Sequence, residues 1–207
     1  MTIESSASIA QFLDATAAKQ PAPGGGSVTA LAGALAAAIG EMVLQYSIGR
    51  KDVLPADDTK LREALAEMTR ARNMLVELMI EDQAAYSALS AARKNARDQG
   101  DADPTFAAAL LACIRIPQAI GATAGALLDL CAQVAPKANK FLLSDLAVCA
   151  ELAMATVRCA TYNVQINLAD VSDATERRHF EDSMNHLIAR ATERIRSIIP
   201  AIWKRLS

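Results

Sequence analysis

The segment PAPGGGS, residues 21–27, and the apolar run behind it constrain the fold more than any other part of the chain. Its two prolines favour an extended backbone, and the three consecutive glycines that follow have no side chains, which leaves the backbone unusually free. From Val28 to Ser47 the chain is dominated by small and aliphatic residues, and Glu41 is the single charge among them. These residue types predict a helix over 27–47 that other helices can approach closely.

Two interpretations of the glycine segment remain open from the residues alone. In the first, the backbone N–H groups of Gly24, Gly25, Gly26 and Ser27 open onto a helix N-terminus and receive an anion or a planar polar ligand. In the second, the glycines form only a tight turn and Ser27 caps the helix. The segment is neither a P-loop nor a dinucleotide-binding fingerprint, because it lacks the Lys-Ser or Lys-Thr pair of the one and the glycine spacing of the other.

Composition predicts an all-α protein in one domain spanning residues 1–207. Small helix formers are abundant, β-branched runs of strand length are few, and no linker, composition break or repeat divides the chain. We therefore expect a single-domain bundle of five to seven helices. A formal net charge of −2 gives no electrostatic case for nucleic acid, and an aromatic content of 4% leaves few groups for stacking on bases.

Several of the expected helices are apolar on more than one face, which favours a homodimer with the 27–47 helix as the leading interface. Glu41 interrupts that helix before the length of a membrane span is reached, so no membrane contact is expected. The four cysteines match no zinc pattern, and we expect them to be reduced and buried in a cytoplasmic protein. With two histidines in the chain, both near residue 180, no histidine-based metal site is expected.

Apolar periodicity predicts the other helices. They are expected over 3–18, 57–99, 105–135, 137–168 and 173–203. The stretch 57–99 contains neither Pro nor Gly, so it is one very long helix or two helices joined without a strong breaker. Pro117 lies inside its predicted helix and is expected to kink it. Asp173 is expected to cap the last helix.

Acidic residues embedded in apolar helices are the first candidates for chemistry. Asp82 lies at the edge of a face formed by Leu78 and its apolar neighbours, and a solvated helix charge is the alternative. Asp145, with Ser144 before it, precedes a long apolar run. For Asp145 the alternative is an ordinary acid near a helix start, where the helix dipole favours negative charge.

Amides and cations form a second group of candidates. Asn163 and Asn167 are four residues apart and share one helix face, where two carboxamides could bind a heterocycle. Capping or inter-helix hydrogen bonds are the alternative for these two amides. Asn139 lies in KANKFLLSDLAV, the stretch that also contains Ser144 and Asp145. Arg50 and Lys51 follow the 27–47 helix and could receive a carboxylate, or could form a solvated surface pair.

Taken together, these residues resemble a known family. PAPGGGSVTALAGALAAAIGEMV followed by SIGRK is similar to the opening of the cyclodeaminase/cyclohydrolase family, which includes the C-terminal domain of formiminotransferase-cyclodeaminase and stand-alone bacterial methenyltetrahydrofolate cyclohydrolases. The resemblance continues in order over nearly the whole chain, at Glu81–Asp82, Pro117, Asn139, Ser144–Asp145, Arg158, Asn163 and Asn167. Family members often read K-K-K-Y after I-G, whereas here Arg50 and Lys51 precede Asp52 and Val53.

The resemblance implies an all-α homodimer that acts on one-carbon-substituted tetrahydrofolate, with no metal and no organic cofactor beyond the folate substrate. The cyclohydrolase adds water to 5,10-methenyltetrahydrofolate and gives 10-formyltetrahydrofolate. The cyclodeaminase converts 5-formiminotetrahydrofolate to the methenyl form and releases ammonia. A diverged folate-binding or assembly module without catalysis is the third possibility.

On this resemblance we expect the following roles. Methenyltetrahydrofolate carries positive charge at its bridging carbon, so Asp145 or Asp82 would stabilise that charge and take a proton from water, with Ser144 placing the water. The glycine segment would lie against the ligand, the asparagine pair would contact the pterin edge, and the two basic residues would meet the glutamate tail. The expected substrate-binding residues are Gly24, Gly25, Gly26, Ser27, Arg50, Lys51, Asn139, Asn163 and Asn167.

Overall fold

Six α-helices and one short 3-10 helix make up the part of the chain that the structure describes, which confirms the predicted all-α class. The computed structural model describes residues 7–99 and 105–206, and no strand occurs within these ranges. The helices are α1 (Ile9–Ala17), α2 (Gly25–Gln45), α3 (Pro55–Gln99), α4 (Phe106–Val134), η1 (Lys140–Leu142), α5 (Leu143–Leu168) and α6 (Ala174–Leu206).

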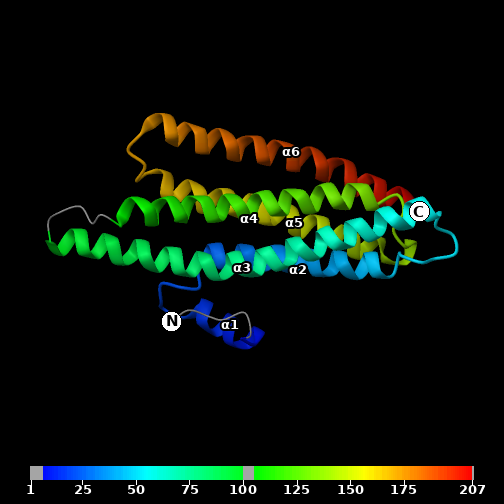
Figure 1. Cartoon of the computed structure of the whole chain (residues 1–207), viewed down its shortest axis with the longest axis horizontal. Helices are drawn as coiled ribbons and strands as arrows, with labels where there is room; N and C mark the ends of the chain where they lie inside the picture. Colours follow the sequence, from blue (N-terminus) through cyan, green and yellow to red (C-terminus); the bar gives the residue numbers. More distant parts are fainter. Residues whose placement is uncertain (1–6, 100–104, 207) are drawn as a thin grey trace.

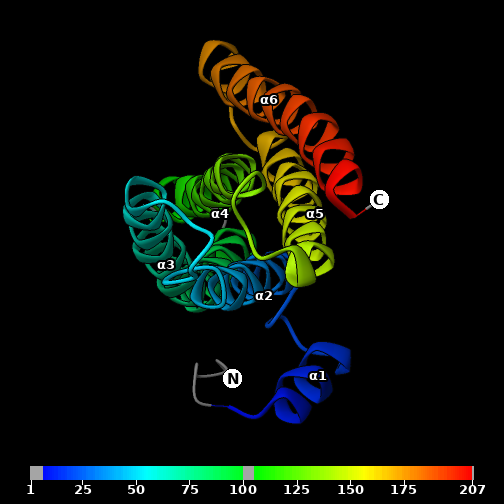
Figure 2. The ribbon, with the colours of Figure 1, turned by 90° about the vertical axis from the view of Figure 1, so that its right-hand side faces the viewer.

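Four helices lie side by side in the bundle, and two lie outside it. The helices α2, α3, α4 and α5 run along the long axis of the molecule (Figure 1). In the end view, α6 packs against the outside of α5 and α4, and α1 stands apart beside α2 (Figure 2). The helix count agrees with the expected five to seven.

Local sequence explains most of the helix boundaries. The stretch 57–99, without Pro or Gly, lies in one helix, α3, which begins at Pro55 and has 45 residues. Helix α1 begins at Ile9 because Ser8 and Gln11 form a capping box, while residues 3–6 of the predicted helix lie outside the described residues. Asp173 caps α6 as predicted, since its side chain accepts from two backbone N–H groups at the helix start.

Glycines spaced seven residues apart set the packing of α2 against α3. At each of them an added Cβ would press on one α3 side chain, at a separation between 1.9 and 3.1 Å. The pairs are Gly26 with Asp82, Gly33 with Leu75, and Gly40 with Met68. The residue numbers of these contacts fall by seven on α3 as they rise by seven on α2, so the two helices are antiparallel. Their close approach depends on the absence of side chains at the glycines.

Helix α5 packs on another side of α2 in the same antiparallel sense. Three α5 residues, again seven apart, face α2 glycines at 3.0–3.1 Å from the position of an added Cβ. The pairs are Gly25 with Asn163, Gly33 with Thr156, and Gly40 with Cys149. Small residues therefore allow α2 to lie close to both neighbours, as its composition predicts.

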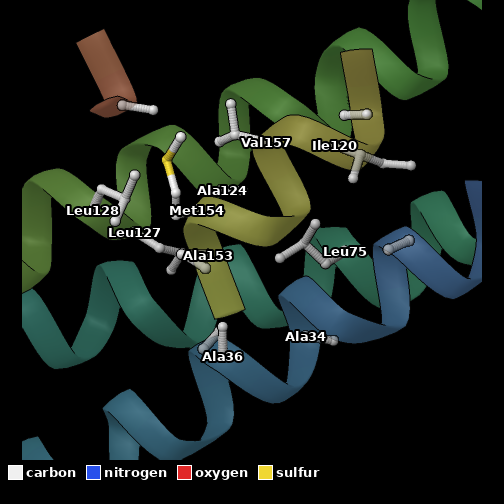
Figure 3. Packing of buried hydrophobic residues seen from close by; sticks show 14 of the residues in the cluster. Ala34, Ala36, Leu75, Ile120, Ala124, Leu127, Leu128, Ala153, Met154 and Val157 are labelled. Carbon is white, nitrogen blue, oxygen red and sulfur yellow. The ribbon is translucent and has the colours of Figure 1, made fainter. Parts of the chain in front are cut away.

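Aliphatic side chains from four helices fill the interior of the bundle. Figure 3 shows Leu75 of α3 among side chains of α2, α4 and α5, with Leu127 on α4 and Met154 on α5 nearby. Helices α2 and α4 are long and apolar enough to cross a membrane by length and composition, but they also supply much of this core. All four cysteines are free thiols; three are buried, but Cys159 is exposed, so its predicted burial is wrong.

Candidate functional site

Asp82 interrupts an otherwise apolar row along α3. Side chains of this row recur every seven residues and are almost completely buried at Leu61, Met68, Leu75 and Leu89. Residues seven apart lie on nearly the same face of a helix, so the partly buried Asp82 faces the same way as its apolar neighbours. A carboxylate in this position is costly unless it has partners, and the alternative of a solvated helix charge is wrong.

The carboxylate of Asp82 reaches the first turn of α2 from a different helix. Its Oδ2 accepts a 2.8 Å hydrogen bond from Ser27 Oγ, and both the hydroxyl and the backbone N–H of Ser27 act to lower its pKa. Helix α2 begins at Gly25, and Gly24 at the N-cap position offers no side chain. Ser27 is therefore not the capping residue; it lies fully buried in the first turn and connects α2 to Asp82.

Two glycines of the segment have no room for a side chain, because side chains of neighbouring helices lie against them. An added Cβ on Gly26 would lie 1.9 Å from Asp82 Oδ1, and one on Gly25 would lie 3.0 Å from Asn163 Oδ1. At Gly24 the nearest atom would be the Pro21 carbonyl oxygen at 3.9 Å, which is ordinary contact. Gly25 is also exposed, so this end of α2 combines a buried acid with backbone open to solvent.

Burial dominates the electrostatics around Asp82. Loss of solvent raises the pKa of Asp82 above its ordinary 3.8, although the hydrogen bonds from Ser27 act in the opposite direction. Burial also raises the pKa of the Cys113 thiol to about 11, with a further increase from the negative charge of Asp82. Arg93 lowers the pKa of Cys113 and forms a 2.5 Å ion pair with Asp170. Asp82, Cys113 and Arg93 thus share one electrostatic environment.

The two predicted amides lie on α5 near this acid. Asn163 Nδ2 donates to Thr29 Oγ1 at 3.1 Å. Asn167 Nδ2 donates to the backbone carbonyl oxygen of Asn163 at 2.9 Å and to that of Cys113 at 3.1 Å. We call Gly25, Gly26, Ser27, Thr29, Asp82, Asn163 and Asn167 the N-terminal cluster, after the end of α2 that it surrounds.

A second group of predicted residues lies beyond the other end of α2. Asn139 donates its backbone N–H to Ser47 Oγ at 2.9 Å and its Nδ2 to the Tyr46 carbonyl oxygen at 3.3 Å, and its Oδ1 caps η1. Arg50 pairs with Asp52, yet its Nη1 is buried without a hydrogen-bond partner among the described residues. Lys51 is exposed.

Ser144 and Asp145 lie in the first turn of α5, near this second group. Asp145 is partly buried and Ser144 is exposed, and neither side chain is hydrogen-bonded to another described residue. We call Arg50, Lys51, Asn139, Ser144 and Asp145 the C-terminal cluster.

The structure brings the predicted residues together in two places rather than one. Asp145 and Asn163 are at opposite ends of α5, and at about 1.5 Å of rise per residue they are about 27 Å apart along the helix axis. Asp82 lies near Asn163, since the two contact adjacent glycines of α2. Asp82 and Asp145 are therefore far apart within one chain.

Sequence reasoning missed three members of the acid's surroundings, Thr29, Cys113 and Arg93. Thr29 could have been noticed, because it is a polar residue in an apolar run and lies four residues after Gly25. Cys113 and Arg93 carry no such signal, since their proximity to Asp82 depends on how α3 and α4 pack.

A groove of about 600 Å³ lies between α4 and α6, lined by Arg115, His179 and His186 among others, and it does not include the acids of either cluster. Within residues 7–99 and 105–206 no three His, Cys, Asp or Glu side chains are grouped so that they could hold a metal ion.

Comparison with known proteins gives consistent matches. The family model described as formiminotransferase-cyclodeaminase matches residues 8–186. A methenyltetrahydrofolate cyclohydrolase of Methylorubrum extorquens is 30% identical over 169 residues, covering 80% of this chain and 81% of that protein. A formimidoyltransferase-cyclodeaminase of Rattus norvegicus is 31% identical over 88% of this chain, but the chain spans only 34% of that longer protein.

The fold has a close counterpart among solved structures. The crystal structure of formiminotetrahydrofolate cyclodeaminase from Thermotoga maritima superposes with a TM-score of 0.90 at 25% identity, covering 98% of both chains. The family match includes the glycine segment, Asp82 and both asparagines of the N-terminal cluster. This chain is therefore a member of the formiminotransferase-cyclodeaminase family.

Proposed function

We propose that this protein hydrolyses 5,10-methenyltetrahydrofolate to 10-formyltetrahydrofolate, with no cofactor beyond the folate itself. The observation that carries the proposal is the buried carboxylate of Asp82, held at the exposed glycine end of α2 in a chain that covers 81% of a named cyclohydrolase. A partly buried acid beside open backbone is suited to a cationic ligand.

The reaction needs a group that stabilises positive charge and a group that accepts a proton. Water adds to the bridging carbon and a C–O bond forms; the bond from that carbon to N5 then breaks, one water proton ends on N5, and the other is released. We assign charge stabilisation to Asp82, because its position against the helix N-terminus is fixed by Ser27. We assign the proton to Asp145, whose carboxylate has no protein partner among the described residues, with Ser144 beside it to place the water.

We also propose that the two clusters meet across a homodimer. Exposed apolar side chains run along α2 and α5 between the clusters, at Val28, Leu35, Val148, Tyr162 and Ile166. A second copy that packs antiparallel on this surface would bury these side chains. It would also place the C-terminal cluster of one copy beside the N-terminal cluster of the other, giving two composite sites per dimer. Arg50, with its unpartnered Nη1, would then receive a carboxylate of the ligand.

The second candidate activity is that of a formiminotetrahydrofolate cyclodeaminase. It is favoured by one observation, the match to the Thermotoga maritima cyclodeaminase over 98% of both chains. The same acids would serve that reaction, since it also passes through the cationic bridging carbon. We propose a cytoplasmic location, because all four cysteines are free thiols and such thiols persist in reducing compartments.

The decay of methenyltetrahydrofolate absorbance tests the proposed activity. Purified protein should accelerate the decay, with 10-formyltetrahydrofolate as the product. Ammonia released from 5-formiminotetrahydrofolate, without acceleration of methenyl hydrolysis, would favour the cyclodeaminase instead. A folded protein that accelerates neither reaction would reject both enzymatic functions and leave a binding or assembly role.

A further inference from the structure

The hydrogen bonds of Thr29 determine which end of the Asn163 amide faces the site. Thr29 Oγ1 lies 2.6 Å from the Gly25 carbonyl oxygen. Two oxygens approach this closely only with a proton between them, and a carbonyl has none to give, so the Thr29 hydroxyl must donate. Because its single proton is used there, Thr29 Oγ1 can only accept from Asn163, at 3.1 Å.

The atom of Asn163 bonded to Thr29 is therefore its Nδ2, and the opposite atom is its oxygen. Asn163 Oδ1 lies 3.0 Å from the position of a Cβ on Gly25, at the exposed start of α2. No hydrogen bond from another described residue reaches Oδ1, and this oxygen is not among the buried unpaired atoms. Asn163 thus presents an acceptor to the open end of the helix.

Asn167 is fixed in the same sense by a different pair of partners. Its two close contacts, at 2.9 and 3.1 Å, are both carbonyl oxygens, so the atom facing them must be Nδ2. With both amide protons used, Asn167 has only its oxygen left for another partner. Asn167 therefore has only an acceptor left, and Asn163 turns its Oδ1 toward the start of α2 while one of its two Nδ2 protons is held by Thr29.

We infer that Thr29 is a positioning residue that fixes Asn163 as a hydrogen-bond acceptor, so that the N-terminal cluster recognises an N–H donor edge of its ligand. This inference rests on the proposed function, and a tetrahydropterin supplies such an edge through its ring N–H groups and its exocyclic amino group. A ligand that turned a carbonyl or a deprotonated ring nitrogen toward Asn163 Oδ1 would face oxygen with no proton between them, so this acceptor disfavours such an edge.

Thr29→Val tests the inference, with tetrahydrofolate as the probe and Thr29→Ser as the matched control. Valine keeps the shape of threonine but removes the acceptor for Asn163 Nδ2, so the amide loses its fixed orientation. We expect tetrahydrofolate affinity to fall about tenfold, which corresponds to one weakened hydrogen bond. The Michaelis constant should rise by a similar factor with little change in kcat. Serine keeps the hydroxyl and should stay within about twofold of wild type.

Affinity unchanged in Thr29→Val, or a fall in kcat alone, would overturn the inference, as would equal losses in the valine and serine variants. If Thr29→Val does not fold, as judged by thermal unfolding, Thr29→Ala carries the same expectation. A wild-type protein that binds no tetrahydrofolate would reject the proposed function itself, which separates that failure from a failure of the role of Thr29.

Discussion

The two ends of α2 carry the same kinds of residue but use them differently. At the N-terminal cluster, Asp82 of α3 and Asn163 of α5 are hydrogen-bonded to Ser27 and Thr29 in the first turns of α2, and Asn167 is held by backbone carbonyl oxygens of Cys113 and Asn163. At the C-terminal cluster, Asn139 is hydrogen-bonded to Tyr46, Ser47 and Phe141, while Asp145 and Lys51 have no partner of opposite charge within the described chain. One end is pre-organised within a single chain, and the other is not.

This difference indicates where each half of the chemistry can be supplied. A pre-organised acid stabilises charge without reorganising, which suits the fixed position of Asp82. An unpartnered acid such as Asp145 is free to take a proton when a ligand and a second copy approach. If both halves are needed, activity depends on how two chains combine, and hybrid dimers test this directly.

The largest expected effect is the recovery of activity in a hybrid of two inactive variants. Asp82→Asn and Asp145→Asn should each lower turnover by about 10² to 10⁴-fold, the usual contribution of one acid or base. In a hybrid of the two variants, one of the two composite sites contains both wild-type acids. Equal co-expression with different tags makes half of the dimers hybrids, and each hybrid has one active site of two. The whole mixture should therefore show about one quarter of wild-type activity.

The controls for this experiment are the two homodimers and the double variant, which should stay inactive at the same sedimentation coefficient as wild type. A hybrid as inactive as its parents would place both acids in one chain's site or remove one acid from the mechanism. Wild-type turnover in Asp145→Asn would remove Asp145, and a monomeric wild-type protein in sedimentation would reject the composite site.

The next largest effect concerns Cys113, whose pKa is raised in part by the negative charge of Asp82. With a pKa of about 11, against an ordinary 9.0, its thiolate population near pH 8 should be about a hundredfold lower than that of an unperturbed thiol. Iodoacetamide should therefore modify the exposed Cys159 long before Cys113, as peptide mass spectrometry would detect. Asp82→Asn should speed the modification of Cys113, because one contribution to its raised pKa is removed. Equal rates in both proteins would contradict the shared environment.

A smaller effect separates two adjacent glycines. In Gly26→Ala the new Cβ would meet Asp82 Oδ1 at 1.9 Å, so α2 and α3 must move apart, and we expect a loss of about 1–3 kcal/mol in the free energy of unfolding. Gly24→Ala is the control, because its Cβ would have 3.9 Å of clearance and its backbone is extended. Urea unfolding of the two variants should differ by most of that amount, and equal stabilities would contradict the close approach of Asp82.

The fold was predictable because its signals are local. The stretch without Pro or Gly became one helix, and the run of small residues became the helix that both α3 and α5 approach closely. The start of α2 was misjudged because the sequence offers Ser27 as a cap. The helix instead begins at Gly25, and Ser27 is hydrogen-bonded to Asp82, which is distant in the sequence and is brought there only by packing.

The site was predictable in its members but not in its arrangement. Seven-residue spacing could have placed Asp82 in an apolar row with Leu75 and Leu89, and four-residue spacing put Asn163 and Asn167 on neighbouring turns of α5, where Asn167 donates to the Asn163 backbone. Periodicity within one helix cannot say which ends of different helices meet. For that reason the separation of Asp145 from Asp82 became visible only once the antiparallel order of α2 and α5 was known.

The smallest expected effect is a pH dependence of stability that belongs to Asp82 alone. Because its pKa is raised in the folded state, the folded protein binds more protons than the unfolded chain just above pH 3.8. The contribution of Asp82 to stability is thus fully present below that pH and is lost as the pH rises through the raised pKa. Asp82→Asn cannot titrate, so the difference in unfolding free energy, wild type minus variant, should fall between about pH 4 and neutral pH. Urea unfolding at several pH values measures this difference. An increase with pH would mean that the hydrogen bonds at the start of α2 outweigh burial, which would make Asp82 chiefly a helix cap.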